Sequence, residues 1–312
     1  MSAESAIYNS NEIPHLTSLA DCVRLNNGVM MPRLGIGTWF DHDRWTGLEN
    51  DIELAVKSIL AGIKAGYRAI DTAYSYGTEP AIGIALREGA FKREEVFITS
   101  KYMSLEMGYD DVFSIFDETL SDMNTEYLDL YLIHWAKLYP DQDVFVDVWK
   151  AFEKLYKDGR VRAIGVSNFT KEHLERLFNE TEIVPAVHQI ELNPFFQQKE
   201  MRAFCMQHGI QVEAWTILGY GRIFYNETIK TLAKKYKKTE TQITVRWALQ
   251  QGVITMTRAE REEWLIENGN VFDFEISKED MALLETLNTN QRIGADPNDG
   301  PIGGSTEKQQ KP

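Results

Sequence analysis

The chain is 312 residues long, with a formal net charge of −14 and hydrophobic and charged fractions of 43% and 26%. These values are typical of a soluble globular protein, and the acidic balance argues against binding to nucleic acid. No apolar run approaches the roughly 18 residues of a membrane span, and no secretory signal is evident. The two cysteines make neither a disulfide framework nor a metal site. We therefore expect a cytoplasmic protein that binds neither membrane nor metal.

The first element that the sequence predicts is a β-hairpin. After a polar leader, residues 1–21, two short apolar runs in residues 22–34 flank Asn26-Asn27-Gly28. Asn-Gly between apolar runs is a strong signal for a two-residue hairpin turn.

Strand-like and helix-like stretches then alternate to about residue 288. The eight strand candidates are LGIGTW (34–39), RAIDTA (68–73), VFITSKY (96–102), LDLYLIHW (128–135), VRAIGVSN (161–168), AVHQIEL (186–192), QVEAWTIL (211–218) and GVITMTR (252–258). Amphipathic helix candidates lie between them at 51–67, 110–124, 143–159 and 239–252.

Eight apolar strands alternating with helices predict an α/β protein with a parallel sheet covered by helices. We expect a (β/α)8 TIM barrel in a single domain, residues 22–304, with the hairpin closing its N-terminal mouth; an open doubly wound sheet is the alternative. The chain ends in a Gly/Pro-rich loop, roughly 290–304, and a polar tail, residues 305–312, which we expect to be disordered.

Four polar residues stand where predicted strands give way to loops: Asp71, Tyr76, Lys101 and His134. A barrel of parallel strands collects such strand ends into one pocket. There, an ammonium beside the phenol would lower its pKa, a carboxylate would balance the ammonium, and an imidazole would hydrogen-bond a substrate carbonyl. This set can protonate a carbonyl oxygen but supplies no hydride, which points to a nicotinamide cofactor.

Each of these residues alone has an ordinary structural explanation. Asp71 could cap the helix that begins near Thr78, Tyr76 could be a loop aromatic, Lys101 a solvated charge and His134 a core histidine. Their joint position on three successive strand ends favours the catalytic interpretation.

The same segments resemble the aldo-keto reductase family, over about residues 22–300. The resemblance rests on Lys101, His134 and four motifs: DTAYSYGTE (71–79), GVSNF (165–169), HQIELNPF (188–195) and EAWTILG (213–219). It implies an eight-stranded barrel that reduces aldehydes and ketones with NAD(P)H.

The resemblance also implies roles for particular residues. Tyr76 would be the proton donor, Lys101 and Asp71 would tune its pKa, and His134 would orient the carbonyl. The cofactor would contact the ends of the first, second, fifth, sixth and seventh strands, at Gly37, Thr38, Trp39, Asp71, Ser167, Asn168, Gln189, Trp215, Thr216 and Leu218. Trp39, His134 and Trp135 would line the substrate site.

After the last strand the chain departs from the family pattern. The family's usual Pro-Lys-Ser is here Thr257-Arg258-Ala259. Arg258 and Ala259 would hold the adenosine phosphate and Asn268 the adenine, although Glu260, Glu262 and Glu263 add negative charge that would repel a phosphate. We therefore favour NADPH, with NADH or dual use as the alternative.

The predicted substrate pocket departs as well. Met103 and Ile217 replace an aromatic and a proline common in the family, and the loop at 290–304 contains no aromatic residue. We expect this loop to close the pocket weakly and the enzyme to accept small or polar carbonyl compounds.

No apolar patch argues for assembly, so we expect a monomer. Two other functional classes remain open at this point: a non-catalytic NADPH-binding sensor or channel-associated subunit, and a hydrolase or isomerase that uses Asp71 and His134.

Overall fold

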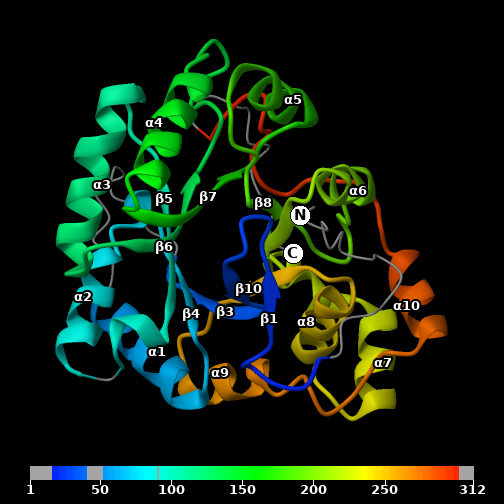
Figure 1. Cartoon of the computed structure of the whole chain (residues 1–312). Coiled ribbons are helices and arrows are strands. Elements are labelled where there is room, and N and C mark those ends of the chain that lie inside the picture. Colours follow the sequence, from blue (N-terminus) through cyan, green and yellow to red (C-terminus); the bar gives the residue numbers. More distant parts are fainter. Residues whose placement is uncertain (1–15, 41–51, 90, 302–312) are drawn as a thin grey trace, which may run out of the picture.

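The computed structural model describes residues 16–40, 52–89 and 91–301. Its main feature is a closed barrel of eight parallel strands in sequence order, because β10 pairs with both β9 and β3 (Figure 1). The strands are β3 Leu34–Gly37, β4 Ala69–Asp71, β5 Phe97–Tyr102, β6 Leu128–Ile133, β7 Val161–Ser167, β8 Val187–Glu191, β9 Gln211–Trp215 and β10 Ile254–Thr257. Closure confirms the predicted barrel and excludes the open sheet.

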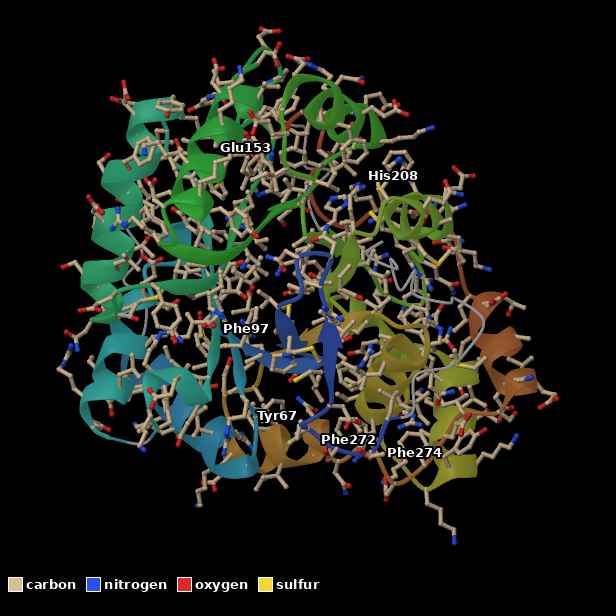
Figure 2. The ribbon with its side chains drawn as sticks, viewed as in Figure 1. Tyr67, Phe97, Glu153, His208, Phe272 and Phe274 are labelled. Carbon is tan, nitrogen blue, oxygen red and sulfur yellow. The ribbon has the colours of Figure 1, made fainter. Side chains whose placement is uncertain are left out.

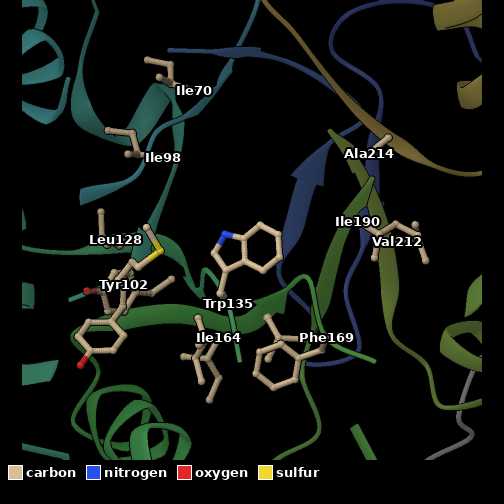
Figure 3. Packing of buried hydrophobic residues seen from close by; sticks show 14 of the residues in the cluster. Ile70, Ile98, Tyr102, Leu128, Trp135, Ile164, Phe169, Ile190, Val212 and Ala214 are labelled. Atoms are coloured by element: carbon tan, nitrogen blue, oxygen red, sulfur yellow. The ribbon is translucent and has the colours of Figure 1, made fainter. Parts of the chain in front are cut away.

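Helices cover the outside of the barrel (Figure 1). They are α1 Ile52–Ala65, α2 Glu79–Arg87, α3 Tyr109–Met123, α4 Phe145–Lys157, α5 Lys171–Glu180, α6 Lys199–Gln207, α7 Glu227–Tyr236, α8 Glu240–Gln250, α9 Glu262–Gly269 and α10 Lys278–Glu285, with short 3-10 turns η1 Tyr74–Tyr76, η2 Arg93–Glu95 and η3 Gly219–Tyr225. The four helices expected from amphipathic spacing are α1, α3, α4 and α8. Apolar side chains between helices and strands form one large cluster, part of which surrounds Trp135 in Figure 3.

The predicted hairpin is confirmed as β1 Cys22–Arg24 and β2 Met30–Pro32, which pair antiparallel. The predicted two-residue turn is wrong, because residues 25–29 form the connection, with the amide of Gly28 donating to the carbonyl of Leu25 at 2.9 Å. Gly28 has a φ of 90°, a backbone conformation that glycine adopts without a steric penalty. The amide groups of Asn26 and Asn27 donate to the carbonyls of Pro185 (3.0 Å) and Arg162 (2.9 Å), beside the N-terminal ends of β8 and β7. The hairpin therefore closes the bottom of the barrel.

The interior above the hairpin is apolar. Val23, Leu25 and Met31 of the hairpin segment pack against Phe97 and Leu130 from the barrel strands. Phe97, labelled in Figure 2, belongs to this interior cluster. Because strands in a parallel barrel are buried on both faces, near-continuous apolar runs such as β6 are what the architecture requires.

The ends of the chain are only partly described. Leu16 is buried against Leu34 and Tyr67, so the last part of the predicted leader packs on the barrel. Residues 1–15 and the predicted tail lie outside the described residues. In the parts of the chain that are described, no helix has the length and apolarity needed to cross a membrane.

Candidate active site

A pocket of about 760 Å³ opens at the C-terminal ends of the barrel strands. Thirteen of the residues proposed from the sequence line it: Gly37, Thr38, Trp39, Asp71, Tyr76, His134, Trp135, Asn168, Gln189, Trp215, Thr216, Leu218 and Arg258. Lys101, Ser167, Ala259 and Asn268 are not among the lining residues. Strand ends far apart in the sequence thus meet around one cavity, as the barrel prediction requires.

Lys101 does not line the pocket itself; its side chain is fully buried and contacts two of the lining residues, Asp71 and Tyr76. Its ammonium donates to Asp71 Oδ1 at 2.7 Å, to the carbonyl of Thr72 at 2.8 Å and to Tyr76 Oη at 3.3 Å. An ammonium has three hydrogens, so these three acceptors account for all of them. The predicted pairing of Lys101 with Asp71 and Tyr76 is confirmed.

Asp71 reaches this position because β4 ends there and the backbone continues directly into η1. The amide of Thr38 donates to the carbonyl of Asp71 (3.0 Å), which joins the ends of β3 and β4. The carboxylate of Asp71 accepts hydrogen bonds from Lys101 and Gln189. It caps no helix, because Thr78 is the N-cap residue of α2. The capping interpretation of Asp71 is therefore wrong.

The pKa of Tyr76 is raised above its ordinary value of 10, mainly because burial disfavours the phenolate. Lys101 lowers this pKa, as the sequence interpretation held, but by less than burial raises it. The expectation of a net lowered pKa for Tyr76 is therefore wrong. Burial also works to lower the pKa of Lys101, yet Asp71 and Tyr76 raise it above its ordinary value, so the ammonium stays charged.

His134 is buried beside Tyr76, with the two ring centroids 5.6 Å apart in an edge-to-face arrangement. Burial, and then the charge of Lys101, hold the pKa of His134 well below 6.5, so the ring is neutral at neutral pH. Nδ1 lies 3.3 Å from Ser75 Oγ, which leaves Nε2 as the nitrogen available to a ligand. The ring centroid of Trp39 lies 6.5 Å from that of Tyr76, and the ring centroid of Trp135 lies 6.5 Å from that of His134.

A second hydrogen-bond network lies around Asn168, which is bonded to the backbone of His134. Asn168 Nδ2 donates to the carbonyl of His134 (3.1 Å) and to Ser167 Oγ (3.0 Å), while its Oδ1 accepts from Trp215 Nε1 (3.0 Å). Ser167 is fully buried behind Asn168. The bond from Nε1 anchors the Trp215 indole, which lines the pocket, to Asn168.

Gln189 joins this side of the pocket to the charged pair. Its Nε2 donates to Asp71 Oδ2 at 2.9 Å and to Glu213 Oε1 at 2.5 Å. Both hydrogens of the amide are then engaged, so Gln189 can offer only its carbonyl oxygen to a ligand.

Arg258 marks the outer end of the pocket. Its Nη1 donates to the carbonyl of Trp39 at 2.9 Å, and the guanidinium lies 5.6 Å from the ring centre of Phe40. Ala259 is buried, and its carbonyl accepts a bond from Ser58. Asn268 is buried in α9, which is attached to the barrel by a bond from Tyr67 Oη to the carbonyl of Leu265 (3.0 Å; Tyr67 is labelled in Figure 2).

Sequence reasoning predicted that the loop at 290–304 closes the pocket weakly, but it did not single out the individual residues that complete the pocket wall. They are Tyr220 and Gly221 in η3, Met256 and Thr257 at the end of β10, and Ile293, Gly294, Ala295 and Pro301 in the terminal loop; Ile217 was noted only as a departure from the family. The terminal loop is held by Glu191, whose carboxylate accepts from the amides of Ile293 (2.8 Å) and Gly294 (3.0 Å). A glutamate at the end of a buried strand was a signal that could have indicated such an anchor.

The arrangement fits a nicotinamide ring. The Trp215 indole is anchored to Asn168 and lines the pocket, and Gln189 and Asn168 have amide oxygens suited to a carboxamide. Tyr76 and His134 face the same cavity, where a substrate carbonyl would lie. Among the described residues there is no group of three or more His, Cys, Asp or Glu side chains that could hold a metal ion.

Comparison with known proteins gives a consistent result. A model of the aldo/keto reductase family matches residues 33–289, which span all eight barrel strands. Glyoxal reductase of Bacillus subtilis is 45% identical over 283 residues, covering 91% of this chain and 98% of that protein. The 9,11-endoperoxide prostaglandin H2 reductase of Trypanosoma cruzi is 42% identical over 287 residues, covering 91% and 97%. Among solved structures, a Gox0644 variant in complex with NADPH has a TM-score of 0.82 at 38% identity, covering 89% of this chain and 97% of that one.

Proposed function

The chain belongs to the aldo/keto reductase family, and from this premise we propose that it reduces aldehydes and ketones to alcohols with NADPH. The observation that carries the proposal is the buried Lys101 ammonium, which contacts Asp71 and Tyr76 directly beside the pocket. When bound, the nicotinamide supplies the hydride that reduces the carbonyl carbon.

In this proposal Tyr76 donates the proton that the carbonyl oxygen requires. Its raised pKa keeps the phenol protonated at neutral pH until negative charge develops on that oxygen. Lys101 then stabilises the phenolate, with Asp71 balancing its charge. Neutral His134 orients the substrate by hydrogen-bonding the carbonyl oxygen through Nε2.

We propose the same cofactor contacts as the sequence suggested. Gln189 and Asn168 would bind the carboxamide with Ser167 supporting Asn168, Trp215 would stack on the ring, and the backbone near Thr216 and Leu218 would pass along the cofactor. Gly37, Thr38 and Trp39 would form the opposite wall.

For the substrate we propose small aldehydes that carry a second oxygen function, with glyoxal as the first to test. A relative that is 45% identical is named Glyoxal reductase. The terminal-loop part of the wall is formed by Ile293, Gly294, Ala295 and Pro301, none of them aromatic, which suits a small, polar substrate.

The test compares NADPH oxidation with glyoxal, methylglyoxal and simple aldehydes and ketones in wild type and Tyr76→Phe. We expect wild-type turnover and a loss of at least about 100-fold in kcat for the variant, because only the transferable proton disappears. NADPH affinity should remain within about twofold of wild type, since the ring of Tyr76 is retained. A wild type that binds NADPH but does not oxidise it with any carbonyl would instead favour the non-catalytic sensor.

We propose NADPH rather than NADH as the preferred cofactor. Arg258 is exposed at the pocket rim, and Lys64 pairs with Glu262 at 2.7 Å, which offsets one of the three glutamates near the expected phosphate site. Arg258→Ala should lower kcat/KM for NADPH by about tenfold while changing that for NADH by less than about twofold, as expected for loss of an exposed charge–phosphate contact. Equal losses with both cofactors would remove the support for a phosphate contact.

We also propose that the protein is cytoplasmic and that it is a monomer. Sedimentation of the purified protein would test the second directly.

A further inference from the structure

Glu213 is a buried acid that the proposed mechanism does not use. It lies on β9, where it pairs with Gln189 of β8 and Ile254 of β10, and it is 0% exposed. One of its oxygens accepts from Gln189, and the other, Oε2, has no hydrogen-bond partner among the described residues. A charged carboxylate in this position would carry a large desolvation cost, because the Lys101 ammonium already pairs with Asp71 at 2.7 Å.

The groups that face Glu213 keep it uncharged. Burial, and then the charge of Asp71, raise its pKa to about 8, while Gln189 and Lys101 lower it by less. At neutral pH Glu213 is therefore a neutral acid, whose carbonyl oxygen can accept the Gln189 bond and whose other oxygen carries the proton.

The two carboxyl groups together determine how the Gln189 amide lies. A single acceptor would leave the amide free to rotate about one N–H···O bond. Two acceptors, Asp71 Oδ2 at 2.9 Å and Glu213 Oε1 at 2.5 Å, fix both its flip state and its plane. The Gln189 carbonyl oxygen is then the only atom of the amide that remains for a ligand.

We propose that Glu213 is a positioning residue for hydride transfer: it holds Gln189 so that its carbonyl oxygen receives the carboxamide of the nicotinamide and sets the ring face presented to the substrate. The inference rests on the proposed function, because it takes the pocket to be the nicotinamide site. Glu213 itself touches neither substrate nor cofactor in this arrangement.

The test uses three single variants of the full chain, a Gln189→Met background, and NADPH carrying deuterium at one of its two C4 positions. Glu213→Leu removes the acceptor that Gln189 uses. Glu213→Gln keeps an acceptor and matches the neutral acid in shape. Thr255→Val, on the neighbouring strand, also removes a buried polar group but makes no contact with Gln189 among its described hydrogen bonds, so it is the matched control.

We expect Glu213→Leu to weaken NADPH binding by about 5- to 30-fold, the range for losing a buried hydrogen bond, and to transfer hydrogen from the wrong face in a measurable fraction of turnovers. Glu213→Gln and Thr255→Val should stay within about twofold of wild type in binding and keep full stereospecificity. In a Gln189→Met background, Glu213→Leu should have no further effect, because it acts through the amide that is already absent.

Wild-type binding and stereospecificity in Glu213→Leu, or effects that add to those of Gln189→Met, would overturn the inference. Should Glu213→Leu not fold, Glu213→Met takes its place in the same cycle with the same expectations. A wild type without carbonyl turnover would refute the proposed function instead, so the two failures are distinguishable.

Discussion

At its N-terminal end the barrel interior is filled by Met31 and its apolar neighbours, whereas at its C-terminal end the same strands enclose Asp71, Lys101, Gln189 and Glu213. Both layers are buried, so solvent exposure does not explain why one is apolar and the other charged. Apolar burial stabilises the fold directly, while buried charges have to be balanced by one another at a desolvation cost. The comparison teaches that one end of this barrel maintains the fold and the other holds reactive groups that the fold must accommodate.

The strongest way to break the C-terminal layer is Lys101→Met, which leaves Asp71 buried without its cation. We expect the free energy of unfolding to fall by about 3–5 kcal/mol and turnover to be lost, because removing one partner of a buried ion pair leaves an uncompensated charge. Urea unfolding followed by fluorescence would measure the change.

The control for this variant is the double substitution Asp71→Asn with Lys101→Met. It should regain at least about half of the lost stability, since no buried charge remains, yet it should stay inactive. A single Lys101→Met variant as stable as wild type would show that the pair is not mutually compensating.

At the opposite end, Met31→Ala tests whether the apolar layer affects stability alone. Met31 is fully buried on β2, so its truncation should cost about 2–4 kcal/mol through lost apolar contacts and a residual cavity. The kcat of the folded protein should remain within about twofold of wild type. A large loss of kcat at temperatures where the variant is folded would contradict this separation of the two layers.

The third expected effect, similar in size to that of Met31→Ala, is a pH dependence of stability that depends on Glu213. Its pKa rises from 4.5 to about 8 on folding, so the native state holds a proton that the unfolded chain releases. The resulting stabilisation is complete below pH 4.5 and is lost as the pH rises through about 8.

Glu213→Gln removes this titration. The difference in free energy of unfolding between Glu213→Gln and wild type should therefore change with pH. As the pH rises from 5 to 9, it should shift in favour of the variant by about 2–4 kcal/mol, at about 1.4 kcal/mol per pKa unit. Unfolding curves of wild type and Glu213→Gln, recorded side by side at several pH values, measure the difference in their free energies of unfolding. The contributions of other titrating groups cancel in this difference. Identical pH dependence in both proteins would mean that Glu213 is already ionised at neutral pH.

Much of the fold could be predicted from local patterns. Apolar runs such as residues 128–133 bounded by helical segments identified all eight strands, and Asn27-Gly28 identified the hairpin. The contacts of Lys101 with Asp71 and Tyr76 followed from one rule, that parallel strands place their carboxyl ends at one mouth.

Other features depended on distances between groups that no local pattern contains. Whether burial or Lys101 decides the pKa of Tyr76 depends on how deeply the phenol lies in the pocket. Glu191 and Gly294 are 103 residues apart, and their contact exists only because the terminal loop returns across the mouth.

By itself, the sequence determined the periodicity of its elements and the chemical kinds of side chain at the strand ends, because both depend on neighbours along the chain. Only the tertiary structure decided which of those side chains share protons. The two acceptors of the Gln189 amide come from strands 118 residues before it and 24 residues after it. Hydrogen bonding and desolvation act over a few ångströms in space, so closing the barrel was required to define them.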